Sequence, residues 1–138
     1  MSLSTFKNKT VLITGASAGV GAACARYFAH AGANLALVAR GDVALHAIAD
    51  ELREYTQVLT ITADVSEISL CKNIVERVVE EFSEIHLLIN NAGVHHRGEF
   101  SAVKADYVAA MVDVNLRAPL YLTALVLPYI KQAGEGAI

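Results

Sequence analysis

The stretch TGASAGVG, residues 14–21, follows directly on the apolar run VLI at residues 11–13. The apolar run predicts a short buried strand, and the Ala-rich residues after the glycines predict a helix. Gly15 can take a positive φ, which lets the chain turn sharply off the strand. Gly19 leaves the backbone open to a close ligand, and Gly21 lets the helix pack closely against the sheet. The stretch therefore predicts a strand, a tight turn and a helix.

The start of this predicted helix is suited to bind an anion. Its first N–H groups have no partner within the helix, and the helix dipole places positive charge there. The hydroxyl of Ser17 can add a further donor. In α/β proteins a strand, a glycine-spaced turn and a helix in this order hold the pyrophosphate of a dinucleotide. The alternative is a glycine-rich connection without a ligand; the strand before the turn and the helix after it favour the binding interpretation.

Composition narrows the class of protein. The chain has 138 residues, of which 54% are hydrophobic, and this length fits one domain or part of one. The formal net charge is −3 at pH 7 and no basic patch is present, so nothing indicates nucleic-acid binding. The five histidines do not have the spacing of metal ligands, and we expect no metal site.

Three features lead us to expect a cytoplasmic protein. Residues 1–10 are polar and lack the apolar centre of a secretory signal. Cys24 and Cys71 both fall in predicted helices, which favours reduced thiols over a disulfide framework. The most apolar helical run, residues 118–130, is shorter than the roughly 20 residues of a membrane span and contains two prolines, so we expect no membrane segment.

Strand-like and helix-like runs alternate along the chain. Strands are predicted over residues 11–14, 34–39, 57–62 and 85–90, and helices over residues 19–31, 42–55, 66–82, 102–110 and 112–132. The strands are nearly continuous apolar runs, which indicates a parallel sheet covered on both faces. Right-handed crossovers then give a doubly wound α/β fold of the Rossmann type, with strand order 3-2-1-4 and the start of a fifth strand at residues 137–138. Asp42 and Ser66 are the expected N-caps of the second and third helices.

Four further landmarks follow the glycine turn, and each falls at a strand end or a helix start. They are Arg40, Asp64-Val65, Asn90-Asn91-Ala92-Gly93 and Asn115. Together with residues 14–21 they resemble the short-chain dehydrogenase/reductase family over nearly the whole chain. The resemblance implies that residues 1–138 form an NAD(P)-binding Rossmann domain that is incomplete at its C-terminus.

The resemblance also implies which residues bind the cofactor. They are Gly15, Ser17, Ala18, Gly19, Val20, Gly21, Arg40, Asp64, Val65, Asn90, Ala92 and Gly93. Arg40 lies where an NAD site carries a carboxylate, and its guanidinium suits the 2′-phosphate of NADP. A charge-assisted hydrogen bond of roughly 1.5–3 kcal/mol corresponds to a preference for NADP over NAD on the order of 10- to 150-fold. Asp42 is close in sequence and could weaken this preference.

Three polar residues have a structural interpretation beside the one that the resemblance implies. The implied role of Asp64 is to accept a hydrogen bond from the adenine amino group; it also fits a helix-capping pattern, but Ser66 can cap and leave Asp64 free. Asn91 can instead hold neighbouring backbone. Asn115 is implied to join a catalytic tetrad with a serine, a tyrosine and a lysine, and the alternative is an amide that bonds the backbone of its own helix.

The other members of that tetrad cannot be assigned within residues 1–138. None of the five tyrosines has a lysine four residues later, so no Tyr-x-x-x-Lys pair is present. We therefore expect the cofactor-binding part of an NADP-dependent oxidoreductase acting on an unknown carbonyl or alcohol substrate, without catalysis by these residues alone. The alternative is a non-catalytic dinucleotide-binding or partner-interaction module. An apolar fourth strand at the sheet edge predicts a homo-oligomer or completion by further chain.

Overall fold

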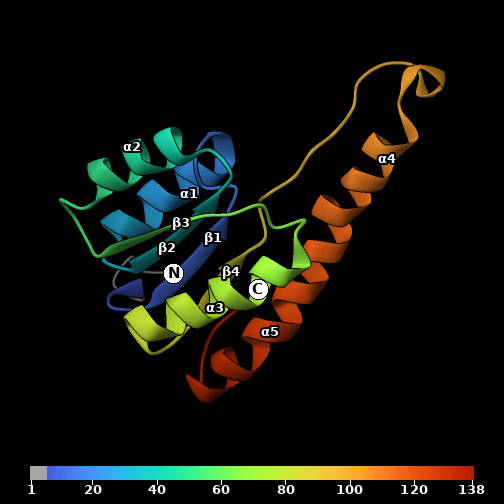
Figure 1. The fold of residues 1–138 in the computed structure, drawn as a ribbon. Helices are drawn as coiled ribbons and strands as arrows, with labels where there is room; N and C mark the ends of the chain where they lie inside the picture. Colours follow the sequence, from blue (N-terminus) through green and yellow to red (C-terminus); the bar gives the residue numbers. More distant parts are fainter. Residues whose placement is uncertain (1–5) are drawn as a thin grey trace.

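Four parallel strands form a single sheet in the order β3-β2-β1-β4, which confirms the predicted α/β class and strand order. The computed structural model describes residues 6–138, so the expectation about a secretory signal in residues 1–10 lies partly outside the described residues. The strands are β1 (Thr10–Thr14), β2 (Asn34–Ala39), β3 (Val58–Thr62) and β4 (Leu87–Ile89). Figure 1 shows the sheet in the middle of the molecule with helices on both sides.

Two helices cover each face of the sheet (Figure 1). The first pair is α1 (Gly19–His30) and α2 (Asp42–Leu52), and the second pair is α3 (Ile68–Phe82) and α5 (Ala118–Gln132). Alternate residues of β1 reach opposite faces: Val11 and Ile13 pack with α1 and α2, while Leu12 packs with α3 and α5. Because both faces are covered, all five residues of β1 are buried, and the strand has no polar alternation.

The N-caps of two helices differ from the prediction. The backbone cap of α2 is Gly41, so Asp42 is already the first helical residue. The cap of α3 is Glu67, and no side chain caps either helix. The hydroxyl of Ser66 donates to the Asp64 carboxylate instead, within a turn over residues 64–67 that is closed by the bond from the Glu67 N–H to the Asp64 carbonyl. The prediction that Ser66 caps the helix is therefore wrong.

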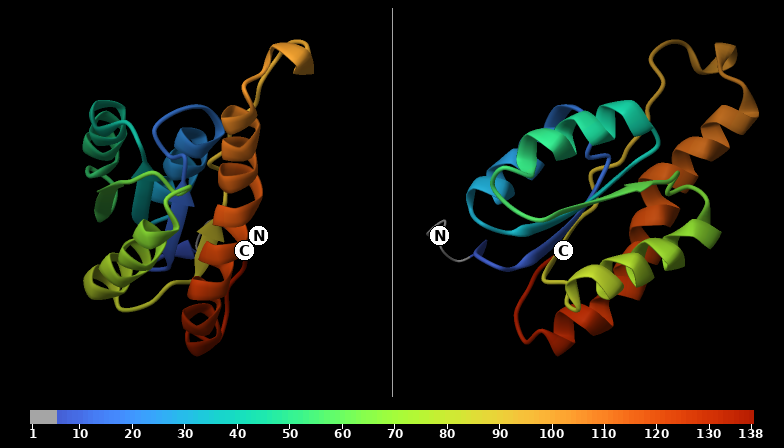
Figure 2. Two further views of the ribbon diagram at one scale, coloured as in Figure 1. Left: turned by 45° about the vertical axis from the view of Figure 1, so that its right-hand side comes forward. Right: turned by 60° about the vertical axis from the view of Figure 1, so that its left-hand side comes forward.

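The predicted break between two helices near residue 111 is also wrong. The helix α4 (Ala105–Val112) continues through a π-helical turn, Asp113–Arg117, directly into α5. Pro119 has no N–H to donate to the carbonyl four residues earlier, that of Asn115, and this missing bond accounts for the local widening of the helix. Asn115 therefore lies within a continuous helix rather than at the start of one. Figure 2 shows the α4 end of this helix standing beyond the sheet.

The continuous helix is longer than the apolar run considered in the sequence as a membrane span. Over Ala105–Gln132 it is 28 residues long, and by length and composition it is long and apolar enough to cross a membrane. The run of residues 118–130 was too short because it left out α4. Part of the helix belongs to the protein core: one face of α5 is buried against the sheet and α3, through Ala118, Leu122, Val126 and Ile130.

The last residues begin a further strand beside β4, as predicted. Ala137 forms a parallel bridge with Leu87, donating its N–H to the carbonyl of His86 at 3.0 Å. A Cβ at Gly136 would collide with that same carbonyl, so this close approach requires glycine. An ion pair of 2.5 Å between Lys9 and Glu135 joins this segment to the start of β1.

His86 supplies a buried acceptor at this end of the sheet. Its Nδ1 accepts a hydrogen bond from the N–H of Thr10 at 3.1 Å, and the residue is 7% exposed. Burial lowers the pKa of His86 from its ordinary value of 6.5, and Lys9 lowers it further against the opposing charges of Glu84 and Glu135. A protonated Nδ1 can no longer accept from Thr10.

We predict that this histidine makes the fold sensitive to acid. Because folding lowers the pKa of His86, the unfolded chain binds more protons below pH 6.5, and the free energy of unfolding falls as the pH drops from 7.5 to 5.5. His86→Asn keeps an acceptor without the titration, so its urea stability should fall less over the same interval. Equal losses in both proteins would contradict the prediction.

Candidate functional site

The ends of β1 and β4 are joined by one asparagine and one threonine. The side-chain N–H groups of Asn91 donate to the carbonyls of Thr14 and Gly15, each at 3.0 Å. The hydroxyl oxygen of Thr14 accepts the backbone N–H groups of Asn91 and Ala92, each at 3.1 Å. The structural interpretation of Asn91 therefore describes its contacts. Thr14 is the first residue of the glycine stretch, but no local pattern indicates that its hydroxyl accepts from the loop after β4.

The glycine turn, residues 14–21, fits against this connection with no space for side chains at two positions. Gly15 has a φ of 66°, and a Cβ there would lie 2.8 Å from Asn91 Nδ2 and 2.9 Å from the Cα of Ala92. A Cβ at Gly21 would collide with the carbonyl oxygen of Gly15. Gly21 thus lets α1 pack against the turn at Gly15, whereas the sequence predicted that it packs against the sheet.

The start of α1 is open to a ligand. A Cβ built at Gly19 would meet nothing within 4 Å, so the backbone there is accessible. The N-cap, Ala18, is extended and has no capping side chain, and no acidic residue lies in the first turn. Val20 is 71% exposed. The first N–H groups of α1 and the positive end of its dipole therefore face space that an anion can enter.

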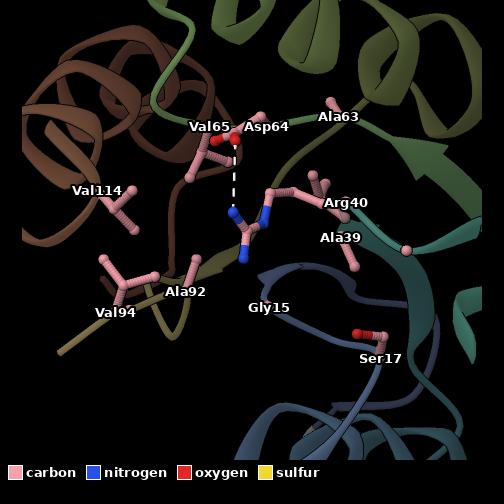
Figure 3. A pocket seen from close by; sticks show the side chains of 13 residues that line it. Gly15, Ser17, Ala39, Arg40, Ala63, Asp64, Val65, Ala92, Val94 and Val114 are labelled. Carbon is pink, nitrogen blue, oxygen red and sulfur yellow. Dashed lines mark ion pairs between the residues drawn. The ribbon is translucent and has the colours of Figure 1, made fainter. Parts of the chain in front are cut away.

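A pocket opens beside this turn, where the parallel strands end (Figure 3). It is lined by Gly15, Ser17, Val38, Ala39, Arg40, Gly41, Ala63, Asp64, Val65, Ala92, Gly93, Val94 and Val114. We call it the strand-end pocket. Seven of the predicted cofactor residues line it, while Ala18, Gly19, Val20, Gly21 and Asn90 lie outside its lining. The six lining residues that were not predicted flank the predicted ones or, in the case of Val114, come from the π-helical turn.

Arg40 and Asp64 form an ion pair in this pocket, with 3.7 Å between Nη1 and Oδ2. The other carboxylate oxygen of Asp64 accepts from the backbone N–H and the hydroxyl of Ser66, at 2.9 and 2.7 Å. Partial burial raises the pKa of Asp64, but the hydrogen bonds from Ser66 and the charge of Arg40 together lower it below its ordinary value. The expectation that Asp64 is free of local partners is therefore wrong.

The carboxylate of Asp42 contacts Thr62 and His46 rather than Arg40. Its carboxylate accepts from the hydroxyl of Thr62 at 3.0 Å and lies 2.9 Å from Nδ1 of His46. Within residues 6–138, the ion pair of Arg40 is with Asp64. Among the described residues, no ion pair between Asp42 and Arg40 supports the expectation that Asp42 weakens the preference for NADP.

The side chain of Asn115 holds the loop after β4. Its Nδ2 donates to the carbonyl of Val94 at 2.7 Å, and its Oδ1 accepts the N–H of the same residue at 2.9 Å. These two bonds go to another segment, so the alternative of an amide bonded to its own helix is not the one observed. Asn90, by contrast, donates to Thr123 at 3.3 Å, and its buried Oδ1 has no hydrogen-bond partner among residues 6–138.

Among the described residues, no group of three or more histidine, cysteine or acidic side chains is placed to hold a metal.

The chain belongs to the short-chain dehydrogenase family: the family model described as "short chain dehydrogenase" matches residues 9–138. A short chain dehydrogenase of Pseudocercospora fijiensis is 34% identical over 135 residues, and 11-beta-hydroxysteroid dehydrogenase 1A of Arabidopsis thaliana is 38% identical over 128 residues. These alignments cover 96% and 91% of this chain but 44% and 37% of the relatives, so the chain spans half of their length or less.

Solved structures carry the same fold. L-Sorbose reductase from Gluconobacter frateurii, complexed with NADPH and L-sorbose, superposes with a TM-score of 0.91 and 31% identity over 96% of this chain and 51% of its own. The NADH-dependent reductase A1-R′, complexed with NAD, gives a TM-score of 0.87 and 30% identity over 96% of this chain and 56% of its own. Members with this fold thus bind nicotinamide dinucleotides of both kinds.

We predict that Asn115→Ala loosens the loop at Val94 without unfolding the chain. Each lost hydrogen bond contributes about 0.5–1.5 kcal/mol, so the amide of Val94 should exchange with deuterium roughly two- to tenfold faster. Ser101→Ala, which removes only an exposed hydroxyl contact to Glu99, serves as the control. Unchanged exchange at Val94 would show that Asn115 does not hold the loop.

Proposed function

We propose that this chain is the NADP-binding part of a short-chain oxidoreductase that acts on a carbonyl or alcohol substrate. The observation that carries the proposal is the strand-end pocket, in which Arg40 and Asp64 lie at the carboxyl ends of parallel strands, next to the turn that leads into the open N-terminus of α1. Ligands of open α/β sheets bind at this position. The family and the NADPH- and NAD-bound structures of similar chains support a dinucleotide as the ligand.

The residues present fit such a cofactor. The open backbone at Gly19 and the first N–H groups of α1 would hold the pyrophosphate, with Ser17 as a further donor. Asp64 and Val65 would hold the adenine, and Ala92 and Gly93 would border the riboses. A bound nicotinamide dinucleotide supplies the hydride that this class of reaction transfers. The contribution of these residues is to bind and orient it.

The preference for NADP rests on Arg40. β2 ends in Ala39, and Arg40 follows it, so no carboxylate is present at this point to hold the 2′-hydroxyl of NAD. The guanidinium projects into the strand-end pocket, and the Arg40 side chain is 67% exposed, which leaves it accessible to a phosphate. Because similar chains bind either cofactor, the choice depends on this side chain rather than on the fold.

We do not expect residues 1–138 alone to transfer a hydride. Asn115 positions the loop at Val94, and the 138 residues contain no Tyr-x-x-x-Lys pair to supply a proton. We propose that this chain binds the cofactor without turning over a substrate, and that a complete active site needs further residues.

We predict that Arg40→Gln lowers the affinity for NADPH relative to NADH. The loss of a charge-assisted hydrogen bond should reduce that ratio by a factor on the order of 10–150. Fluorescence titration of the nicotinamide measures both affinities. Arg53→Gln, which removes the same charge from the opposite end of the sheet, should leave the ratio unchanged. An unaltered ratio in Arg40→Gln would remove the basis for NADP preference.

We also propose that the chain associates with itself through the long helix. Four apolar side chains on one side of it are exposed, namely Val112, Leu116, Leu120 and Leu127. Their spacing of four or seven residues places them on a second face, away from the buried one. Such a stripe commonly marks a surface that binds another protein.

We predict that Leu120→Glu lowers the sedimentation coefficient from that of an oligomer to that of a monomer, because the charge cannot be buried without a partner. Val43→Glu is the control, since Val43 is 84% exposed on the distant helix α2. A wild-type chain that sediments as a monomer would contradict the proposal.

A further inference from the structure

The guanidinium of Arg40 lies inside the strand-end pocket rather than outside it. Figure 3 shows it between Asp64 on one side and Ala92 and Gly15 on the other. Asp64 is the partner that holds it there, at 3.7 Å. A side chain of the protein itself therefore occupies part of the strand-end pocket.

The two carboxylate oxygens of Asp64 have different roles in this arrangement. Oδ1 accepts both hydrogen bonds from Ser66, and these bonds fix the side chain whether or not Arg40 is present. Oδ2 faces Arg40. Because Ser66 keeps the carboxylate in place, Oδ2 can exchange partners without a change in the fold.

Resting on the proposed function, we propose that the Arg40–Asp64 ion pair is a self-occupied state of the cofactor site, and that a nucleotide binds only after this pair opens. Opening costs every adenine nucleotide the same free energy. A 2′-phosphate then gives Arg40 a new anionic partner, whereas a 2′-hydroxyl does not. The same arginine thereby lowers the affinity for nucleotides without the phosphate and raises it for those that carry one.

The size of the effect follows from the exposure of the pair. Exposed ion pairs are stable by only about 0.2–1 kcal/mol. The open, binding-competent fraction of the protein is then a minority of the population, and the apparent affinity is reduced in proportion to that fraction. We expect the ion pair to weaken nucleotide binding by roughly two- to fivefold.

Arg40→Gln separates this mechanism from simple electrostatics. Titration calorimetry with adenosine 2′,5′-bisphosphate and with adenosine 5′-monophosphate, ligands that differ only in the 2′-phosphate, gives the two affinities. The self-occupied site predicts that the variant binds the monophosphate roughly two- to fivefold more tightly and the bisphosphate more weakly. Loss of a positive charge alone would weaken both anions. Arg53→Gln, with the same charge change, should give no gain for the monophosphate.

A double-mutant cycle with Asp64→Asn tests the coupling. If the pair occupies the site, Asp64→Asn should be more favourable for monophosphate binding by roughly two- to fivefold when Arg40 is present than in the Arg40→Gln background. An equal effect in both backgrounds, or no gain of monophosphate affinity in Arg40→Gln, overturns the inference while the proposed function stands. Failure of the wild-type chain to bind either nucleotide overturns both.

Discussion

The hydrogen bonds between Asn91 and the end of β1 are the constraint on which the site depends. They connect β1 with the neighbouring strand β4 at the point where each one leaves the sheet. Because the amide of Asn91 occupies the space beside Gly15 and Gly21, the turn between them has one compact arrangement. That arrangement aims the N-terminus of α1 along the carboxyl ends of the strands, and the other parts of the pocket are placed around it.

We propose that charge gives this framework a preference for an anionic ligand. The helix N-terminus and Arg40 make the strand-end pocket favourable for an anion, and Asp64 is the acidic group within its lining. Asp42 is engaged by Thr62 and His46, and Asp64 is the carboxylate that pairs with the Arg40 guanidinium. In the absence of a ligand, the negative charge of Asp64, which would repel a phosphate, is therefore paired with Arg40.

Much of the fold could be predicted because its signals are local or repeat along the chain. Continuous apolar runs indicated the parallel strands, the doubly wound topology supplied their order, and the glycine spacing indicated the turn at Gly15. The errors have three sources: a local side-chain hydrogen bond, a change in helix geometry and a contact between distant segments. Ser66 has the sequence of a helix cap, but its hydroxyl donates to the neighbouring Asp64. A helix boundary was predicted near residue 111, whereas the helix continues through a π-helical turn. The contact of Asn115 with Val94 joins residues 21 apart, which no local pattern encodes.

Backbone NMR spectra of residues 1–138 during titration with NADPH show whether the strand-end pocket and the start of α1 bind the cofactor. We expect the amide signals that move first to belong to the glycine turn, to Arg40 and Gly41, to Asp64 and Val65, and to Ala92 and Gly93. Amides at the opposite end of the sheet, such as those of Gly32 and Thr56, should keep their positions. Shifts confined to that opposite end, or no shifts at saturating NADPH, would show that the cofactor does not bind at this site.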